Sequence, residues 1–425
     1  MNLPVILPKI KTQQWGCHGC TNCCRELVVH LTPRDRREID RQEWGDKIAG
    51  PAYVKLGGEY VLNHAPHGAC VFLDEAGKCR IHAAHGSEAK PLACQLYPFS
   101  LHRAGTAIRA SLRFDCPSAG RNQGDKISTH GREVKRLARE LDEAAPLMFA
   151  GSPPATLLNK DRTLSSAEED ALLERLDEWL RDTNVPFARR LVGLASITET
   201  LATAKLGGFD EDRFVELMSL LFDDLPAAVD EIHSGPLPPP TARQIRLLRM
   251  TIFAHCEFLR FEQARQGFFA SIRYRWGQLG RARRFASGDG KIPGLWEKCR
   301  KVQHADISPL SKLPLQKDAD ELLTRYLRAR LAGRTAFGAG YYGLSFIDGM
   351  RALLLAICGA GWLASYATFQ REKKVRDVED FVRAVAVVDR NAGRSPELGA
   401  RTAILRGRYL SADQGIIRLI LANFP

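Results

Sequence analysis

Apolar residues recur at helical spacing along most of the chain after about residue 160, which predicts a mostly helical fold there. In residues 165–181, Leu172 and Leu176 share one apolar face, and Ser165 and Glu168 form the capping-box pattern that begins a helix. Similar patterns predict further helices over residues 187–206, 210–222, 241–276, 318–331, 342–368, 376–390 and 396–424. Gly207 and Gly208 are expected to end the helix that begins at Phe187.

The first part of the chain has shorter segments, separated by turn residues. Thr32 and Pro33 predict the start of a helix that runs toward Trp44. Residues 53–62, which contain two consecutive glycines, predict a hairpin, and residues 70–82 predict a second one. A strand is expected over residues 107–114, a turn over 91–98, a charged helix over 129–147, and the exit from this region at 151–155.

Together these patterns predict an α+β fold in which a small cysteine-rich domain with short strands and loops precedes a larger, mostly all-α domain. We place the cysteine-rich domain at residues 1–125, a connecting helix and linker at 126–160, and the helical domain at 161–425. A chain of 425 residues is longer than one hydrophobic core usually serves, which favours more than one domain.

Residues 352–368 form an uncharged run that is short for a membrane span and is interrupted by Gly359 and Gly361. We therefore expect a buried core helix there and no membrane span. The amino-terminal residues show no basic leader and no small-residue cleavage site. These observations favour a cytoplasmic protein.

The formal net charge of +12 suits an anionic partner, because excess positive charge speeds the encounter with acidic molecules. Basic residues are dense from 273 to 301. A solvated loop is the simpler interpretation, and docking of an acidic protein partner or protein substrate is the functional one. Stacking aromatic motifs typical of RNA-binding sheets are not seen, so nucleic acid is not expected. Alternatively, part of the excess offsets the negative charge of metal-bound thiolates. The residues in question are Arg281, Arg283, Arg284, Lys291, Lys298, Arg300 and Lys301.

Eight of the eleven cysteines fall within the first 116 residues, and this clustering is the strongest chemical signal in the chain. The other three, Cys256, Cys299 and Cys358, are isolated and are expected to be small buried apolar residues. The eight clustered cysteines are Cys17, Cys20, Cys23, Cys24, Cys70, Cys79, Cys94 and Cys116.

We expect these eight thiols to bind metal. Disulfides are the alternative, but the cytoplasm keeps thiols reduced. Cys17, Cys20 and Cys23 form a C-x2-C-x2-C run, as in ferredoxin-like iron-sulfur sites, and Cys116 precedes a proline as the last ligand of such sites often does. An iron-sulfur cluster of the 4Fe-4S type is expected. Zinc is the rival, because four thiolates also form closed tetrahedral zinc sites, and spacing alone does not name the metal. Nearby histidines are further candidate ligands: His18, His64, His67, His82, His85 and His102.

The segment resembles the YkgJ-type cysteine-cluster family, a zinc- or iron-chelating domain. The matching pieces are Cys17-His-Gly-Cys20-Thr-Asn-Cys23-Cys24, then Cys70-Val-Phe-Leu-Asp, Gly-Lys-Cys79-Arg-Ile-His, and Cys94-Gln-Leu-Tyr-Pro-Phe. The closing Phe-Asp-Cys116-Pro is similar to that of the FliB flagellin lysine N-methylase branch. The resemblance covers about residues 15–120 and implies metal binding at the eight cysteines.

The FliB branch implies a second hypothesis, a protein lysine N-methyltransferase that uses S-adenosylmethionine. Gly338-Ala-Gly340 and Gly359-Ala-Gly361 lie in or beside helical stretches, so we interpret them as turns or close helix packing and not as a cofactor-binding fingerprint. No catalytic residue can be assigned, and whether the protein is an enzyme stays open. A third hypothesis is a non-catalytic metal carrier or sensor, in which adjacent Cys23 and Cys24 exchange the ion.

Overall fold

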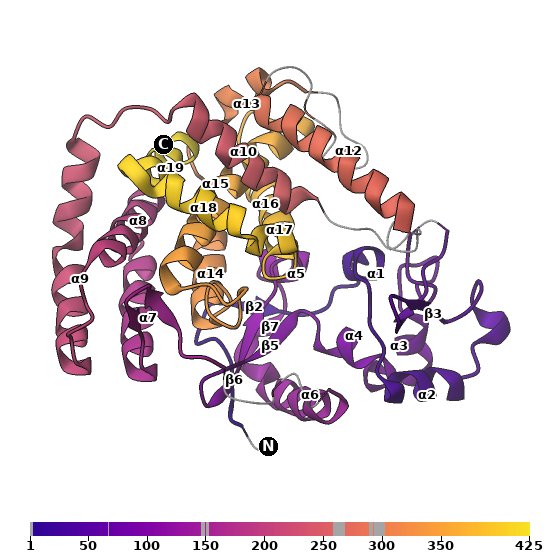
Figure 1. The fold of residues 1–425 in the computed structure, drawn as a ribbon. Helices are drawn as coiled ribbons and strands as arrows, with labels where there is room; N and C mark the ends of the chain where they lie inside the picture. The colour runs from indigo at the N-terminus through magenta and orange to yellow at the C-terminus, as the bar shows by residue number, and fades with distance from the viewer. Residues whose placement is uncertain are drawn as a thin grey trace.

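The computed structural model describes residues 3–66, 68–145, 149, 153–257, 268–288, 292 and 302–425. Its amino-terminal part combines short strands with short helices, and the part from α7 onward is almost entirely helical, which fits the predicted α+β layout (Figure 1). The domain boundaries at 125 and 160 stay predictions.

The amino-terminal part is built from small sheets. β5 (Phe99–Ala104) and β6 (Ala107–Leu112) form an antiparallel hairpin, and β1 (Val5–Ile6) joins β6 in parallel. The predicted strand at 107–114 is therefore confirmed as β6, and the predicted hairpin at 53–62 as β3 (Tyr53–Leu56) and β4 (Glu59–Leu62). The remaining strands are β2 (Gln14–Trp15), β7 (Asp125–Lys126), β8 (Leu157–Asn159) and β9 (Arg162–Thr163).

The two predicted amino-terminal helices are present as α2 (Pro33–Arg41) and α6 (Gly131–Ala144), whereas one predicted hairpin is not. Thr32 caps α2 through a hydrogen bond from Asp35 N, as its sequence pattern predicts. The second hairpin, at 70–82, is reduced to a turn and one bridge between Leu73 and Cys79, because the chain enters α3 directly after Cys79. The bounds are α1 (Asn22–Glu26), α2 (Pro33–Arg41), α3 (Arg80–His85), α4 (Leu92–Leu96), α5 (Pro117–Gly120) and α6 (Gly131–Ala144).

The helical part follows some of the predicted boundaries, but the helix predicted over 210–222 extends from Glu211 to Ser234, and the helix predicted over 396–424 is divided into shorter helices. The capping box at Ser165 is confirmed, but the helix from Phe187 ends at Thr203, so Gly207 and Gly208 lie in the following turn and do not cap it. The predicted helix 241–276 ends at Cys256, and a separate helix begins at Phe268. The bounds are α7 (Ser166–Arg181), α8 (Phe187–Thr203), α9 (Glu211–Ser234), α10 (Ala242–Cys256), α12 (Phe268–Ser287), α13 (His304–Ser311), α14 (Lys317–Ala332), α15 (Phe346–Gln370), α16 (Val378–Asn391), α17 (Pro396–Gly399), α18 (Arg401–Ser411) and α19 (Gly415–Asn423).

α15 is the central helix of the molecule and carries the apolar run noted in the sequence. It is long and apolar enough to cross a membrane, with a mean hydropathy of 1.6, yet 83% of its most apolar window is buried by other parts of this chain. Gly361 packs against Phe424, where an added Cβ would lie 2.9 Å from the ring, so the predicted close helix packing is confirmed. Core packing accounts for its composition.

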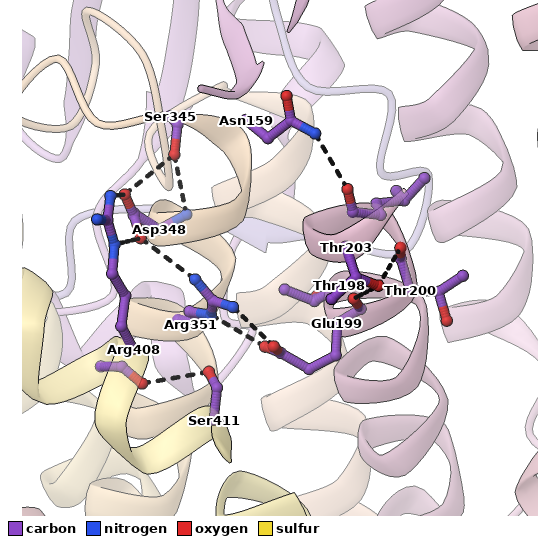
Figure 2. Close-up of polar contacts among 12 residues, drawn as sticks. Asn159, Thr198, Glu199, Thr200, Thr203, Ser345, Asp348, Arg351, Arg408 and Ser411 are labelled. Carbon is purple, nitrogen blue, oxygen red and sulfur yellow. Dashed lines mark hydrogen bonds and ion pairs between the residues drawn. The ribbon is translucent and has the colours of Figure 1, made fainter. Parts of the chain in front are cut away.

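Alternating charges join three helices of the helical part, as Figure 2 shows. Arg351 of α15 pairs with Glu199 of α8 at 2.6 and 2.9 Å, and Arg408 of α18 pairs with Asp348 of α15 at 2.7 and 3.0 Å. Burial opposes ionisation of Asp348, but Arg408 and Arg351 outweigh it and lower its pKa. These pairs fix α8 and α18 on opposite sides of α15.

The buried apolar residues form one large core and one small one. The large core includes residues of β5, β6 and α6 as well as the carboxy-terminal helices, so both ends of the chain share it. The small core lies in the cysteine-rich segment, which occupies one end of the molecule while α7 and α9 occupy the other (Figure 1). Its buried members are Leu31, Ile39, Trp44, Leu62, Val71, Phe72 and Ile81.

Candidate metal centre

The C-x2-C-x2-C-C run folds as a tight turn that leads into α1. Gly19 and Thr21 have left-handed backbone conformations, with φ of 66° and 62°. The chain then enters α1, so Cys23 and Cys24 lie in its first turn with their Sγ atoms 3.8 Å apart. A turn of this kind directs successive sulfurs toward one region, which an extended strand cannot do.

Cys70 and Cys79 are held beside this turn by backbone hydrogen bonds. Cys70 N donates to Cys24 O at 2.7 Å, which joins the loop at residue 70 to α1. The turn before Cys79 is closed by Lys78 N, which donates to the Asp74 carboxylate at 2.7 Å. An added Cβ at Gly77 would lie 3.1 Å from Thr21 Cγ2, so this turn packs directly on the cysteine run.

Cys94 lies on α4, a short helix that a hydrogen bond joins to α2. Asp35, which also completes the capping box of α2, accepts a hydrogen bond from Leu92 N at 3.0 Å. The expected turn at 91–98 is therefore one turn of helix, in which Cys94 N donates to Pro91 O. Cys70, Cys79 and Cys94 all pack against the small core.

Electrostatic interactions connect five of the cysteines, which we call the inner group: Cys23, Cys24, Cys70, Cys79 and Cys94. A hydrogen bond with Cys24 and burial raise the pKa of Cys23. Burial, with the charges of Cys79 and Cys23, raises the pKa of Cys70 to about 12. Burial, with the charges of Cys70, Cys23 and Cys79, raises that of Cys94 well above its usual value, while Lys90 acts in the opposite direction.

The other three cysteines, Cys17, Cys20 and Cys116, form what we call the outer group. Cys116 is the N-cap residue of α5, where burial and the charge of Cys20 raise its pKa to about 11 against hydrogen bonds from the N–H groups of Ala119 and Ser118. Cys17 and Cys20 are exposed. Arg121 pairs with Glu379 of α16 at 2.7 Å, and its guanidinium also interacts electrostatically with Cys20 and Cys116.

The donor set fits a soft metal, but it does not form a closed coordination shell. All the cysteines that the structure describes are free, including the eight predicted ligands. Within these described ranges, no three His, Cys, Asp or Glu side chains stand in a geometry that would hold a metal ion. Thiolates suit zinc and iron-sulfur centres. The described side chains of these cysteines therefore do not stand in a coordinating arrangement, although the inner group lies in one region.

The histidines named from the sequence are spread over several places. His18 Nδ1 lies 2.8 Å from Gly16 O and 3.3 Å from Ser118 Oγ, beside Cys116. His82 and His85 lie on α3, and His102 lies on β5 next to a different cavity. His67 lies outside the described residues.

Of the isolated cysteines that the structure describes, Cys358 is buried as predicted, whereas Cys256 is only partly buried against the large core. Cys358 is fully buried in α15. Cys256 ends α10, and burial raises its pKa. Cys299 lies outside the described residues.

The sequence analysis did not predict a polar cluster around Asp115, the residue before Cys116. Tyr97 donates a hydrogen bond to Asp115 at 3.1 Å, and Arg113 pairs with the same carboxylate. Asp115 is 2% exposed, and its backbone N–H donates to Asp389 of α16. The residue before Cys116 is thus tied to the helical part. Only the acidic residue directly before Cys116 could have suggested this cluster in the sequence.

The comparisons with known proteins agree with this site. No curated protein and no solved structure matches the chain. Residues 16–117 match the model of the CxxCxxCC family, described as "Putative zinc- or iron-chelating domain", which includes all eight predicted ligands. The match ends at residue 117, so the FliB branch is not confirmed. This part of the chain is therefore supported as a cysteine-cluster domain that chelates zinc or iron.

Proposed function

We propose that the inner group binds a zinc ion or an iron-sulfur cluster through thiolates, and that the outer group provides a second site. The observation that carries this proposal is the inner group itself. Five unpaired cysteines from four separate segments lie in one partly buried region, in a part of the chain that matches a metal-chelating family. Zinc would cross-link these segments, whereas an iron-sulfur cluster would add electron transfer.

Charges near the two groups favour thiolate ligands. The pKa of Cys23 is raised by the hydrogen bond with Cys24 and by burial, and that of Cys94 by burial; Lys90 offsets part of both increases, and Arg121 interacts with Cys20 and Cys116. Because burial otherwise keeps these thiols protonated, metal binding must release protons, so affinity rises with pH.

An optical spectrum and a metal analysis of anaerobically purified protein test the proposal. A broad brown absorption with bound iron supports a cluster, and a colourless sample with about one or two zinc ions per chain supports zinc sites. Protein that contains neither metal in stoichiometric amount, before and after incubation with zinc or with iron and sulfide, would contradict the proposal.

For the helical part, we propose that α12 docks an acidic segment of a protein partner. Trp276 and Leu279, which lie one helical turn apart, are 71% and 54% exposed. Arg273, Arg283 and Arg284 on the same helix are also exposed. Exposed apolar side chains beside positive charges suit an acidic amphipathic segment. The basic residues Lys291, Lys298, Arg300 and Lys301 lie outside the described residues.

Binding of poly-L-glutamate tests the docking surface. Reversal of Arg273, Arg283 and Arg284 to glutamate is expected to weaken binding by about tenfold or more at low salt. The matched control reverses Lys160, Lys205 and Arg213, which are exposed near the α8–α9 connection. Equal weakening by both triple variants would show that only net charge matters and would refute a surface on α12.

A further inference from the structure

Three helices of the helical part contain arginines but no acidic residue. α10 has three arginines, α12 has five and α18 has three, and none of these helices contains aspartate, glutamate or lysine. α10 packs against both α12 and α18 (Figure 1). Positive charge is therefore concentrated on three neighbouring helices, although the whole chain has 49 acidic residues to set against its 61 basic ones.

Some of these arginines are neutralised within the protein, but most of the exposed ones are not. Arg281 of α12 pairs with Glu257 at 3.1 Å, and Arg408 of α18 pairs with Asp348 at 2.7 Å. Six other arginines are exposed and make no ion pair with another residue that the structure describes. They are Arg243, Arg246, Arg273, Arg283, Arg284 and Arg401. Such guanidinium groups suit the carboxylates of another molecule.

Exposed apolar side chains lie beside these arginines on α10 and α18, as they do on α12. Met250, Leu405 and Tyr409 are 38%, 52% and 41% exposed. Residues three or four positions apart share one face of a helix, so each helix presents arginine and apolar side chains together. These faces consist of Arg243, Arg246 and Met250 on α10, and of Arg401, Leu405 and Tyr409 on α18.

Contacts between the helices join these faces. The guanidinium carbon of Arg243 on α10 lies 4.4 Å from the centroid of the Tyr409 ring on α18. On the same helix, Arg249 lies against the end of α12, since an added Cβ at Gly288 would be 1.5 Å from Arg249 Nη1. The exposed faces of α10 and α18 are therefore continuous, and α12 extends this surface beyond α10.

We propose that α10, α12 and α18 form one docking surface for an acidic amphipathic segment of a protein partner. The carboxylates of the segment pair with the exposed arginines, and its apolar side chains cover Met250, Leu405 and Tyr409. This inference rests on the docking function proposed for α12 and extends it to two further helices. Because α12 has 20 residues and is about 30 Å long, the surface suits a partner helix of similar length.

The residue types favour carboxylates on a protein over other anions. A planar guanidinium forms two parallel hydrogen bonds with a carboxylate, and Arg408 of α18 already binds both oxygens of Asp348 in this way. Nucleic acid would leave the aliphatic side chains of Met250 and Leu405 unmatched, because its phosphates and sugars are polar. An anionic membrane offers both charge and an apolar interior, so the test includes vesicles.

Fluorescence anisotropy with the full chain tests the proposal, using two labelled peptides of glutamate and leucine, each about 20 residues long. In one peptide the leucines recur at helical spacing on a single face, and in the other the same residues are scrambled. The amphipathic peptide is expected to bind about tenfold more tightly at low salt. Equal binding of both peptides would overturn the proposal. Binding to vesicles of phosphatidylserine and phosphatidylcholine, but to neither peptide, would assign the surface to a membrane and also overturn it.

Reversal of two charges tests the part of the surface outside α12. Arg243→Glu and Arg401→Glu both lie in the first turn of a helix, where the helix dipole favours negative charge, so the fold should be retained. The double variant is expected to bind the amphipathic peptide about tenfold more weakly. Reversal of Lys160 and Lys205 changes the net charge equally and is the matched control. Equal weakening in the two double variants would contradict a surface on α10 and α18.

The apolar contribution is tested by Leu405→Ala. This change is expected to weaken binding of the amphipathic peptide by about threefold or more and to leave poly-L-glutamate binding unchanged, because it removes only apolar contact. Unchanged peptide binding would refute the role of Leu405.

The variants also separate this inference from the docking proposed for α12. If the triple reversal on α12 weakens peptide binding and the double reversal on α10 and α18 does not, docking on α12 stands and its extension is wrong. If neither reversal weakens peptide binding, both proposals are wrong.

Discussion

At the scale of single residues, the eight clustered cysteines differ in how they are held. Cys23, Cys24, Cys70, Cys79 and Cys94 interact with one another, whereas Cys20 interacts with Cys116. Residue type and spacing in the sequence lead to the prediction that these residues bind metal, and this assignment stays a prediction. The sequence could not predict the two groups, because the grouping depends on how distant loops pack.

Cys79→Ser is expected to lower metal affinity by roughly 10–100-fold or more, because loss of a ligand costs at least as much as loss of a group that orients one. Competition with a chromophoric chelator measures this change. Cys256→Ser is the matched control, since Cys256 lies outside both groups and should retain wild-type affinity. Equal losses in the two variants would contradict the assignment of Cys79.

Asp389→Asn is expected to destabilise the protein by about 1–3 kcal/mol, measured by urea unfolding. Asp389 is 3% exposed and accepts hydrogen bonds from the N–H groups of Phe114 and Asp115, at 2.7 and 3.2 Å. Both N–H groups donate to Oδ2, and the other oxygen, Oδ1, lies 3.5 Å from Nη1 of Arg330. The amide would place an NH2 donor against this guanidinium and remove the negative charge that pairs with it. Asp230→Asn removes a surface ion pair with Arg189 and should cost about 0–1 kcal/mol, so an equal effect would refute this role.

At the scale of elements, N-capping patterns were the most reliable sequence signal. Thr32 and Ser165 both cap the helices predicted for them, because an N-cap is a local interaction between residues three positions apart, whereas the C-cap expected at Gly207 and Gly208 was wrong. The hairpin at 70–82 was wrong in part because Cys79 caps a helix that packs on the small core. Tertiary packing, and not the local turn pattern, therefore determines that the chain forms a helix after Cys79.

The start of α16 makes a pH-dependent contribution to stability. Burial opposes ionisation of Asp377, but hydrogen bonds from Lys373 and Arg371 outweigh it and lower its pKa to about 2 from 3.8. The charged form therefore stabilises the fold above the unfolded value of 3.8, and this contribution is lost as the pH falls through about 2.

Asp377→Ala is accordingly expected to lower the free energy of unfolding by about 1 kcal/mol at neutral pH, because it also removes the cap. Urea unfolding of both proteins at several pH values is the measurement. The difference between wild type and variant should narrow below about pH 4. If the difference in the free energy of unfolding widened as the pH fell, the stabilising role of the charged Asp377 would be contradicted.

Close packing at helix glycines gives a paired test. An added Cβ at Gly193 would lie 2.6 Å from the buried ring of Trp179, so Gly193→Ala is expected to destabilise by about 1–3 kcal/mol. The matched Gly277→Ala lies on exposed α12 and meets only Arg281 Nη1 at 3.6 Å. It should stabilise by about 0.5–1 kcal/mol, as Ala does in helices. Thermal unfolding that shifts both variants in the same direction would contradict this packing.

At the scale of the whole molecule, the two cores predict that a bound metal would stabilise one region most. The large core joins β5 and β6 to the carboxy-terminal helices, and buried Arg325 of α14 donates to Gln13, Ala119 and Gly120 at 2.9–3.2 Å. The small core has few buried side chains, and cores of that size usually need a metal or cross-links. The amino-acid composition did not indicate that both ends of the chain share the large core, or that a separate small core exists.

Removal of the metal with a chelator is therefore expected to raise amide hydrogen exchange in residues 22–96 and to leave α14, α15 and α16 protected. Hydrogen exchange read by mass spectrometry resolves these segments. A uniform rise across the chain would show that the metal supports the whole fold and not the small core.

X-ray absorption at the metal edge tests the central claim most directly, because it reports the atoms bound to the ion in the full-length protein. We predict a first shell of sulfur at about 2.3 Å, with about four sulfur ligands per zinc or iron. A shell made of oxygen and nitrogen at about 2.0–2.2 Å, without sulfur, would contradict thiolate binding by the cysteine groups.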